Sequence, residues 1–302
     1  MSVGRTLTLT DGSILGLFFM QRYRFLTISQ YARVADLKKS TASSQLLMLE
    51  RYGLLGHFGN TGIVGHGKTP KVYFLTRKGH EILLRESDIP PELIGHHKEI
   101  HVQSRWSPQM YHRLQTVDVM VSAECAVRSR PHLNMVATFL EYRRVKRGTK
   151  VGRETTDYVA PDETAENRII PDAAFILENV ETKKRRLYFI EMDMGTERIV
   201  SLIYRDSKIT LRHKFLQYDR YLQSKRYAQT YASYGEFVSF VLLFVTTSEE
   251  RIDNIRREMR ELPSELANYY RLATFDAAMG DLLGQIWKSR SISDNTVYSL
   301  VR

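Results

Sequence analysis

Two apolar stretches decide the fold of this chain: IIPDAAFIL at residues 169–177 and YFIEMD at residues 188–193. A polar turn rich in lysine and arginine, residues 179–186, joins them, so the pattern predicts two strands. Each strand carries acidic residues where a hydrophobic side chain is expected. They are Asp172, Glu191 and Asp193.

These acidic residues predict a functional site. Side chains alternate between the faces of a strand, so Glu191 and Asp193 project to the same side. If the two strands pair as neighbours, Asp172 joins them in a three-carboxylate cluster. Such a cluster is costly unless a hard cation neutralises it, and oxygen ligands suit Mg²⁺ or Mn²⁺. The alternative is one solvated face of a strand.

Size and composition indicate an ordinary globular protein. The 302 residues suit two domains, and 43% hydrophobic and 26% charged residues are typical values. No apolar run approaches the roughly 18 to 20 residues of a spanning helix, and residues 14–20 lack the features of a signal peptide. The single cysteine, Cys125, excludes an intrachain disulfide and a multi-cysteine zinc site. We therefore expect a cytoplasmic protein with no membrane partner.

The charge balance predicts a polyanionic partner. The net charge is +10, with 44 Lys and Arg against 34 Asp and Glu. Residues 1–100 hold 13 basic and 8 acidic residues, which leaves 31 and 26 for the rest. The excess is about +5 in each part and is therefore denser in the shorter N-terminal part. No basic amphipathic anchor or lipidation signal favours a membrane, so nucleic acid is the expected partner.

The first ninety residues predict three helices followed by two strands. Thr10 or Asp11 begins a helix that runs to Tyr23, and Thr27 begins a short second helix. A third helix over residues 40–52 ends at Gly53. Strands at residues 54–58 and 71–75 flank a glycine-rich loop. This order, with ERYGLL at residues 50–55 and VYFLTRKGH at 72–80, resembles the winged helix-turn-helix regulators of bacteria.

The resemblance implies DNA contacts from the third helix and from the wing. In such modules the third helix enters the major groove and the wing meets the backbone or the minor groove. The expected DNA-binding residues of the helix are Lys38, Lys39, Ser40, Thr41, Ser43, Ser44 and Gln45, and those of the wing are His66, Lys68 and Lys71. The alternative is a winged helix that binds protein.

The glycine-rich loop also matches a phosphate-binding motif, which we reject. GIVGHGKT at residues 62–69 fits G-x-x-x-x-G-K-[ST]. That motif must open a helix whose N-terminal amides hold the phosphates. Here Pro70 and an alternating, strand-like segment follow. The glycines therefore predict a hairpin and not a nucleotide site.

The remainder predicts an α/β domain. Helices are expected at residues 111–128, 211–222, 248–260 and 277–287, and strands at 135–141, 238–245 and 270–275, besides the two acidic strands. Glu141 ends the first of those strands. Residues 143–168 are charged and lack periodicity, which predicts an exposed insertion. The fold class is α/β, α+β overall, with a three-layer C-terminal domain.

The order of these elements, with Pro171-Asp172 and Glu191-x-Asp193, resembles the PD-(D/E)xK nucleases, whose fold is that of restriction endonucleases. With the winged helix added, residues 10–290 resemble the plasmid replication-relaxation family. The segments that match are IPDA at 170–173, FIEMDMGTE at 189–197, and Lys214 with Tyr218 and Tyr221. The resemblance implies a winged-helix domain at 1–90 and a nuclease-like domain at 91–302. It also implies double-stranded DNA binding in replication or relaxation of a plasmid or mobile element.

DNA nicking is the activity that the resemblance implies for the second domain. Asp172, Glu191 and Asp193 would act in catalysis and bind Mg²⁺ or Mn²⁺, and Glu141 could join as a ligand. The superfamily places Lys two residues after the Glu, where this chain has Asp193. That lysine stabilises the charged transition state, and Lys214 on the next helix is the candidate to replace it.

Other hypotheses remain open at this stage. Lys214 could be an ordinary exposed helix lysine, and the chain a non-catalytic DNA-binding regulator or replication accessory factor with a degenerate nuclease fold. A purely protein-binding adaptor is the weaker third hypothesis. Winged-helix proteins often bind DNA as dimers, so a homodimer is a further expectation.

Overall fold

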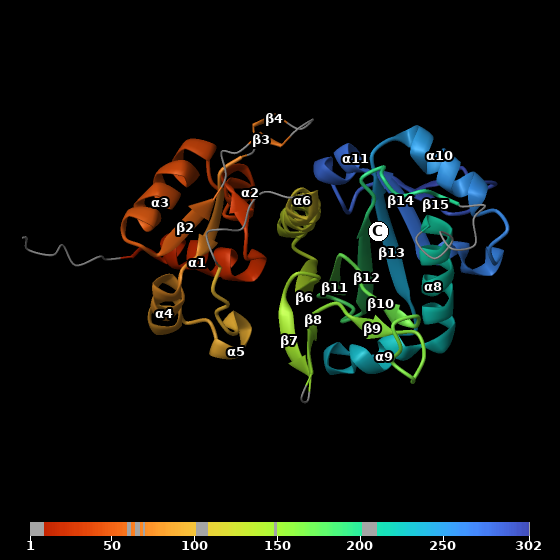
Figure 1. Cartoon of the computed structure of the whole chain (residues 1–302), viewed down its shortest axis with the longest axis horizontal. Helices are drawn as coiled ribbons and strands as arrows, with labels where there is room; N and C mark the ends of the chain where they lie inside the picture. Colours follow the sequence, from red (N-terminus) through yellow and green to blue (C-terminus); the bar gives the residue numbers. More distant parts are fainter. Residues whose placement is uncertain are drawn as a thin grey trace, which may run out of the picture. The chain divides into compact units, whose positions relative to one another are not determined.

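The chain divides into two units, Met1–Val117 and Asp118–Arg302, here called unit 1 and unit 2. The computed structural model describes residues 9–58, 62–63, 67–68, 70–100, 108–147, 150–200 and 210–301 (Figure 1). Only the backbone is described at 62–63, 67–68, 108, 146–147 and 150. Each unit is built around its own sheet.

Unit 1 contains the three predicted helices and the two predicted strands in their expected order, and further short elements besides them. Its elements are α1 (Asp11–Tyr23), β1 (Leu26–Thr27), α2 (Ile28–Val34), α3 (Lys39–Arg51), β2 (Leu55–Phe58), β3 (Gly62–Ile63), β4 (Gly67–Lys68), β5 (Val72–Leu75), α4 (Arg77–Glu86), α5 (Pro91–Ile94) and the first part of α6 (Pro108–Arg128). Thr27 begins α2 as predicted. Its hydroxyl accepts from the Gln30 amide at 3.2 Å, and the Gln30 side chain accepts from the Thr27 amide at 2.9 Å. This reciprocal capping fixes the start of α2.

The sheet of unit 1 is antiparallel, in the order β1-β5-β2, and the β3–β4 hairpin lies between β2 and β5 in sequence. The hairpin confirms the prediction made for the glycine-rich loop. Met110 and Leu114 of α6 pack against Phe25, Phe58 and Phe74. Unit 1 extends beyond the expected boundary at residue 90 because this apolar cluster includes the first turns of α6.

Unit 2 contains a seven-stranded mixed sheet in the order β16-β15-β14-β13-β12-β11-β6. Its strands are β6 (Leu133–Leu140), β11 (Ala173–Asn179), β12 (Arg185–Met192), β13 (Phe240–Thr246), β14 (Tyr270–Thr274), β15 (Trp287–Ser289) and β16 (Val297–Tyr298). The β12–β13 and β13–β14 pairs are parallel and the other pairs antiparallel. The two acidic strands, β11 and β12, are neighbours as predicted. The mixed α/β class, α+β overall, is confirmed.

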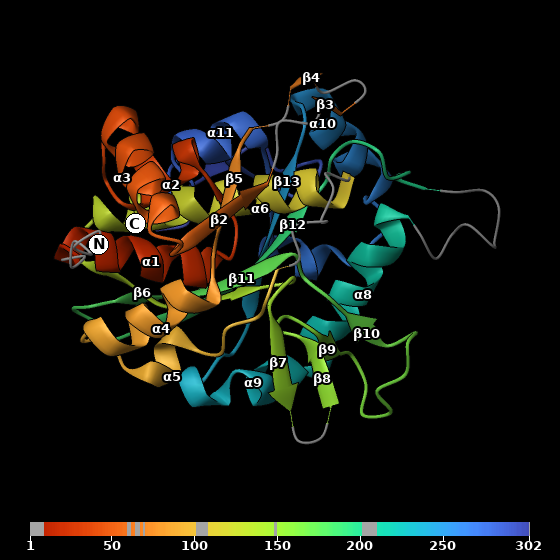
Figure 2. The same ribbon diagram turned by 60° about the vertical axis from the view of Figure 1, so that its left-hand side comes forward.

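Helices cover both faces of this sheet, which gives three layers. Figures 1 and 2 show the second part of α6 on one face and α8 on the other. Besides α6, the helices described in unit 2 are α8 (Leu211–Ser224), α9 (Arg226–Thr230), α10 (Glu249–Glu258), α11 (Phe275–Gly280) and two short 3₁₀ turns, η1 (Ala232–Tyr234) and η2 (Ser264–Tyr269). The Thr210 hydroxyl caps the start of α8, and the Ser248 hydroxyl caps the start of α10.

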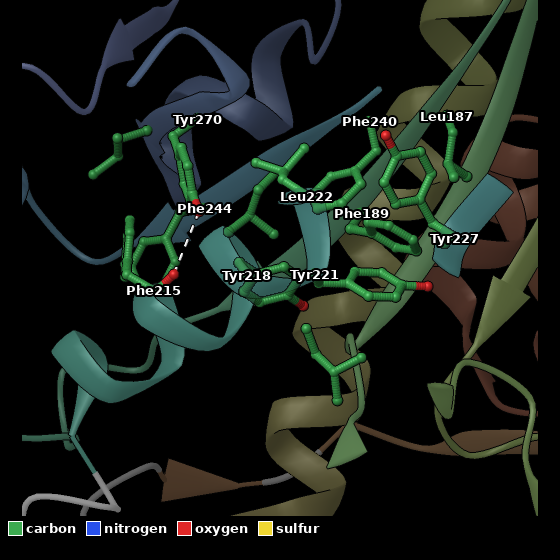
Figure 3. Packing of buried hydrophobic residues seen from close by; sticks show 14 of the residues in the cluster. Leu187, Phe189, Phe215, Tyr218, Tyr221, Leu222, Tyr227, Phe240, Phe244 and Tyr270 are labelled. Atoms are coloured by element: carbon green, nitrogen blue, oxygen red, sulfur yellow. Dashed lines mark hydrogen bonds between the residues drawn. The ribbon is translucent and has the colours of Figure 1, made fainter. Parts of the chain in front are cut away.

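Aromatic side chains fill the core between the sheet and α8. The ring centroids of Phe189 of β12 and Phe240 of β13 are 4.8 Å apart. Both rings contact Tyr218 and Tyr221 of α8, as Figure 3 shows. All four are buried. Because α8 is anchored so firmly, residues on the same face and one turn away are held in fixed positions over the sheet.

The predicted exposed insertion at residues 143–168 is confirmed in part: residues 161–166 are exposed, but the segment is not irregular and part of it is buried. It forms two hairpins, β7 (Arg144–Arg147) with β8 (Lys150–Arg153) and β9 (Asp157–Tyr158) with β10 (Arg168–Ile169). Thr155 and Asp157 are buried, and their partners are the Pro171 carbonyl at 2.6 Å and the Tyr221 hydroxyl. These buried side chains are polar and hydrogen-bonded. The sequence therefore shows no apolar periodicity that would predict their burial.

The predicted helix at residues 277–287 is also wrong in its length. The helix α11 ends at Gly280, and Trp287 belongs to β15. The Trp287 indole is buried and donates to the Leu282 carbonyl at 2.8 Å. Gly280 and Gly284 disfavour a continuous helix. The buried Trp287 side chain fixes the following segment in the sheet as β15.

Candidate functional site

Glu191 is the centre of the candidate site. It lies on β12, between β11 and β13, and is 3% exposed. The Lys214 ammonium of α8 lies 3.1 Å from its Oε2, and the Tyr218 hydroxyl donates to its Oε1 at 2.5 Å. Lys214 and Tyr218 are one helical turn apart, which places both over the same carboxylate.

The electrostatics of this pair are unusual. Burial raises the pKa of the Glu191 carboxyl to about 7, while Lys214 lowers it and Asp172 raises it. Burial lowers the pKa of Lys214, but the charges of Glu191, Glu197 and Asp172 outweigh it and hold that pKa above its ordinary value. The lysine therefore stays charged, and the glutamate can change charge near neutral pH.

Asp172 lies immediately before β11 and faces the end of β12. Its amide donates to the Ile190 carbonyl at 3.1 Å, and its Oδ2 accepts from the Met192 amide at 2.8 Å. The half-buried Asp172 carboxylate is close enough to act on the charges of both Glu191 and Lys214. The structure thus brings together three of the expected site residues, Asp172, Glu191 and Lys214.

Asp193 shares a face with Glu191 but has different partners. Its Oδ1 accepts from the Gly195 amide at 3.1 Å and from Arg251 at 2.9 Å, and its Oδ2 accepts from the Thr246 hydroxyl at 2.6 Å and again from Arg251. A carboxylate has about four lone-pair positions, and these four donors occupy them.

Glu141 also has a cationic partner. Its amide donates to the Asp172 carbonyl at 3.0 Å, which ties the end of β6 to the site, but its carboxylate pairs with Arg153 of β8. Across the described ranges, no group of three or more His, Cys, Asp and Glu side chains is arranged to hold a metal ion. The predicted three-carboxylate cluster is therefore not present in this arrangement.

Of the four expected ligands, Asp172 and Glu191 remain the candidates for a divalent cation. Mg²⁺ is commonly held by one or two carboxylates together with substrate phosphates, and it keeps several waters. Each Glu191 oxygen accepts one hydrogen bond from the described residues, so each retains a lone pair. The donor set therefore fits Mg²⁺ or Mn²⁺ with two protein carboxylates.

Sequence reasoning missed two members of the site. Glu197 lies within 3.5 Å of the Lys214 ammonium, and its carbonyl accepts from Arg251 at 2.6 Å. Arg251 of α10 pairs with Asp193. The matched segment at 189–197 contains Glu197, but nothing in the sequence links it to α8 or Arg251 to β12, since these contacts join distant elements.

The expected DNA-binding residues of α3 are mostly exposed at the start of that helix. Exposed are Lys38, Lys39, Ser40, Thr41 and Ser44, and Ser43 is half-buried. The first turn of α3 holds no acidic residue, and no side chain caps it. Its N-terminal amides and the two lysines therefore present positive potential to solvent.

The other expected DNA-binding residues differ in their surroundings. The Gln45 side chain accepts from Tyr31 at 2.9 Å and donates to Ser13 at 3.1 Å, so it joins α1, α2 and α3. Lys71 pairs with Glu50 at 2.8 Å and lies over the Tyr73 ring. His66 lies outside the described residues, and only the backbone of Lys68 is described.

Membrane insertion has no support in the described helices, none of which combines the length and the apolar character of a spanning segment.

Comparison with known protein families matches residues 17–236 to the replication-relaxation family. Searches among curated proteins and among solved structures gave no match. The family match covers well over half of the chain, which therefore belongs to the replication-relaxation family. This membership supports a role in plasmid replication or relaxation.

Proposed function

We propose that this member of the replication-relaxation family binds double-stranded DNA of a plasmid or mobile element through unit 1. We further propose that unit 2 nicks the DNA with the help of Mg²⁺ or Mn²⁺. The family match, the net charge of +10 and the open N-terminus of α3 support the first part. The pairing of Lys214 with Glu191 supports the second.

Unit 1 is interpreted as a winged helix-turn-helix. Three observations support this interpretation: α2 and α3 follow each other closely, the sheet order is β1-β5-β2, and the β3–β4 hairpin lies between β2 and β5 in sequence. In this interpretation α3 enters the major groove with Lys38 and Lys39 at its leading end. Ser40, Thr41 and Ser44 are available for phosphates or base edges.

The observation that carries the nicking proposal is the contact of Lys214 with Glu191. In the superfamily that the chain resembles, a lysine two residues after the glutamate supplies the positive charge, and here that position is Asp193. Lys214 comes from α8 instead and places its ammonium 3.1 Å from the Glu191 carboxylate. A cation next to the expected metal ligands can stabilise negative charge that develops on a scissile phosphate.

The residues of this chain then have separate roles. Asp172 and Glu191 would hold the cation, which would lower the pKa of a bound water and neutralise charge on the phosphate. Lys214 binds and orients the phosphate next to those carboxylates. Tyr218 fixes the orientation of Glu191 through the hydrogen bond to Oε1. Asp193 is excluded from the proposed ligands because its four donors occupy its oxygens.

Replacing Asp172 tests this proposal. Supercoiled plasmid is incubated with Mg²⁺ or Mn²⁺ and the wild-type chain, Asp172→Asn, or the matched control Asp276→Asn, which changes an exposed residue of α11. We expect open circles from the wild type and the control and none from Asp172→Asn, while all three bind a labelled duplex equally. Wild-type nicking by Asp172→Asn would contradict the site assignment.

A non-catalytic accessory factor is the second candidate function. It is favoured by the ion pairs that bind Asp193 and Glu141 to Arg251 and Arg153, because both carboxylates are thereby withdrawn from a metal. In that case the chain binds DNA but does not relax plasmid, and isothermal titration detects no Mn²⁺ binding. Heat of Mn²⁺ binding that disappears in Asp172→Asn favours the nicking function.

A further inference from the structure

The β7–β8 hairpin of unit 2 concentrates positive charge. Between Tyr142 and Glu154 the chain has no acidic residue and six basic ones: Arg143, Arg144, Lys146, Arg147, Lys150 and Arg153. Figures 1 and 2 both show β7 and β8 side by side as a two-stranded arm that is not part of the seven-stranded sheet. Neither the fold nor the candidate site explains this concentration of charge.

The register of the hairpin places like charges opposite each other. Arg144 pairs with Arg153 across the two strands, and Arg147 pairs with Lys150. Like charges at directly opposite positions of an antiparallel pair destabilise it. The hairpin therefore has a sequence that disfavours its own pairing, unless a negatively charged partner neutralises it.

Among the hairpin side chains that the structure describes, ion pairs neutralise the two arginines at its base. Arg153 pairs with Glu141, and Arg143 lies 3.4 Å from Glu154. The other oxygen of Glu154 accepts from the Leu140 amide at 2.7 Å, which ties the base to β6. Arg144, further along, is exposed and makes no ion pair with any residue that the structure describes.

The base of the hairpin is also next to the candidate site. Arg153 binds the Glu141 carboxylate, and the Glu141 amide donates to the Asp172 carbonyl at 3.0 Å. One residue therefore separates the anchored end of the arm from a proposed metal ligand. A charged arm at this place can hold the polyanion whose phosphate enters the site.

We propose that the β7–β8 hairpin is a second DNA-contacting element, which binds the phosphate backbone of the duplex beside the candidate site. Duplex DNA presents one negative charge per roughly 1.7 Å of its axis, and its major groove admits a two-stranded β-ribbon. This proposal rests on the proposed DNA binding. It adds a contact that belongs to unit 2 and is independent of α3.

The salt dependence of DNA binding tests the hairpin. The affinity of the full-length chain for a labelled duplex is measured over a range of salt concentrations, for the wild type and for Arg144→Gln with Lys146→Gln. Each lost phosphate contact lowers the slope of log affinity against log salt by about 0.9. We therefore expect the double variant to have a slope smaller in magnitude by about two units.

Two controls separate the arm from general charge and from folding. Lys183→Gln with Lys184→Gln removes the same charge from the exposed turn between β11 and β12 and should leave the slope unchanged. Arg144→Lys with Lys146→Arg keeps the charge of the arm and should retain the wild-type slope. Melting temperatures of all variants are compared with that of the wild type.

Several outcomes overturn the proposal. One is a salt-dependence slope equal to that of the wild type in the Arg144→Gln, Lys146→Gln variant. Another is a Lys183→Gln, Lys184→Gln control whose slope falls by the same amount as that of the hairpin variant. A hairpin variant that loses binding to phosphatidylserine vesicles but not to DNA would assign the arm to a lipid surface. A wild-type chain that binds no duplex would overturn the proposed DNA binding as well. Failure of the proposed function is thereby distinguished from failure of the hairpin proposal alone, in which the wild type still binds DNA.

Discussion

Two carboxylate–cation pairs on the same strand differ in how completely each carboxylate is satisfied. Glu191 meets Lys214 from α8, and two residues later Asp193 meets Arg251 from α10. Each Asp193 oxygen has two donors, whereas each Glu191 oxygen has one among the described residues. Both are buried, so the difference lies in hydrogen bonding.

The difference indicates which pair stabilises the fold and which is available for chemistry. A buried ion pair contributes to stability only when its remaining hydrogen-bonding positions are filled. The Asp193 pair meets this condition. The Glu191 pair does not, and burial raises the pKa of Glu191 to about 7. Perturbed groups of this kind cluster at functional sites.

The largest expected effect is a loss of stability when the ion pair between Asp193 and Arg251 is broken. Arg251→Ala leaves Asp193 buried without its cation, which costs about 3 to 5 kcal/mol when a buried pair is broken. Lys214→Ala should cost less, because Glu191 can take up a proton when its partner is lost. Urea unfolding of both variants at pH 7 checks this order. A larger loss in Lys214→Ala would remove the proposed distinction.

The second prediction concerns pH. The folded-state pKa of Glu191, about 7, is above its ordinary value of 4.5, so the folded protein binds this proton more tightly than the unfolded chain. The stability that the proton contributes is present below pH 4.5 and is lost as the pH rises through 7. Glutamine does not titrate, so Glu191→Gln avoids this loss.

Unfolding in urea at pH 5 and pH 8, with a chelator present, measures the effect. Relative to the wild type, Glu191→Gln should gain about 2 kcal/mol between the two pH values, since one pKa unit corresponds to about 1.4 kcal/mol. A relative stability that falls with rising pH would show that Lys214 governs the charge of Glu191 more strongly than burial does.

Tyr218→Phe should have a smaller effect. It removes the hydroxyl that donates to Glu191 Oε1 and keeps the aromatic packing on Phe189. A hydrogen bond to a charged group contributes about 1.5 to 3 kcal/mol, and partial protonation of Glu191 places the expected loss near the lower figure. Thermal unfolding measures it, and an unchanged melting temperature would argue against the bond.

Thr246→Val should have the smallest effect of the four. It removes one of four donors to Asp193 and preserves the side-chain volume. The expected loss is about 1 kcal/mol, the typical contribution of one hydrogen bond. Urea unfolding of Thr246→Val and of Arg251→Ala compares the loss of one hydrogen-bond donor with the loss of the whole guanidinium group. A loss equal to that of Arg251→Ala would show that the Asp193 pair is not saturated.

The sequence predicted the parts of the site that local periodicity determines. Alternation along β12 places Glu191 and Asp193 on one face, and the four-residue spacing places Lys214 and Tyr218 together on α8. Arg251 and Glu197 were missed, because their contacts join elements that are far apart in sequence. The burial of Asp157 was missed for a related reason, since its partner, Tyr221, is equally distant.

The fold was predicted to a similar depth. Strands and helices with strong apolar patterns appear where expected, including β12, β13 and α8. The errors fall where burial follows another rule: the insertion at 143–168 buries paired polar groups, and Trp287 enters β15 from a segment with two glycines. Pattern alone does not encode these tertiary choices.

The rate of plasmid nicking by Lys214→Gln, compared with Arg251→Lys, tests the central claim most directly. Both variants alter the cation that faces a carboxylate of β12, and only the first alters the proposed site. We predict that Lys214→Gln lowers the rate by about 100-fold or more, the usual cost of one group that stabilises transition-state charge. Arg251→Lys should nick within about tenfold of the wild type. Wild-type nicking by Lys214→Gln would contradict the account.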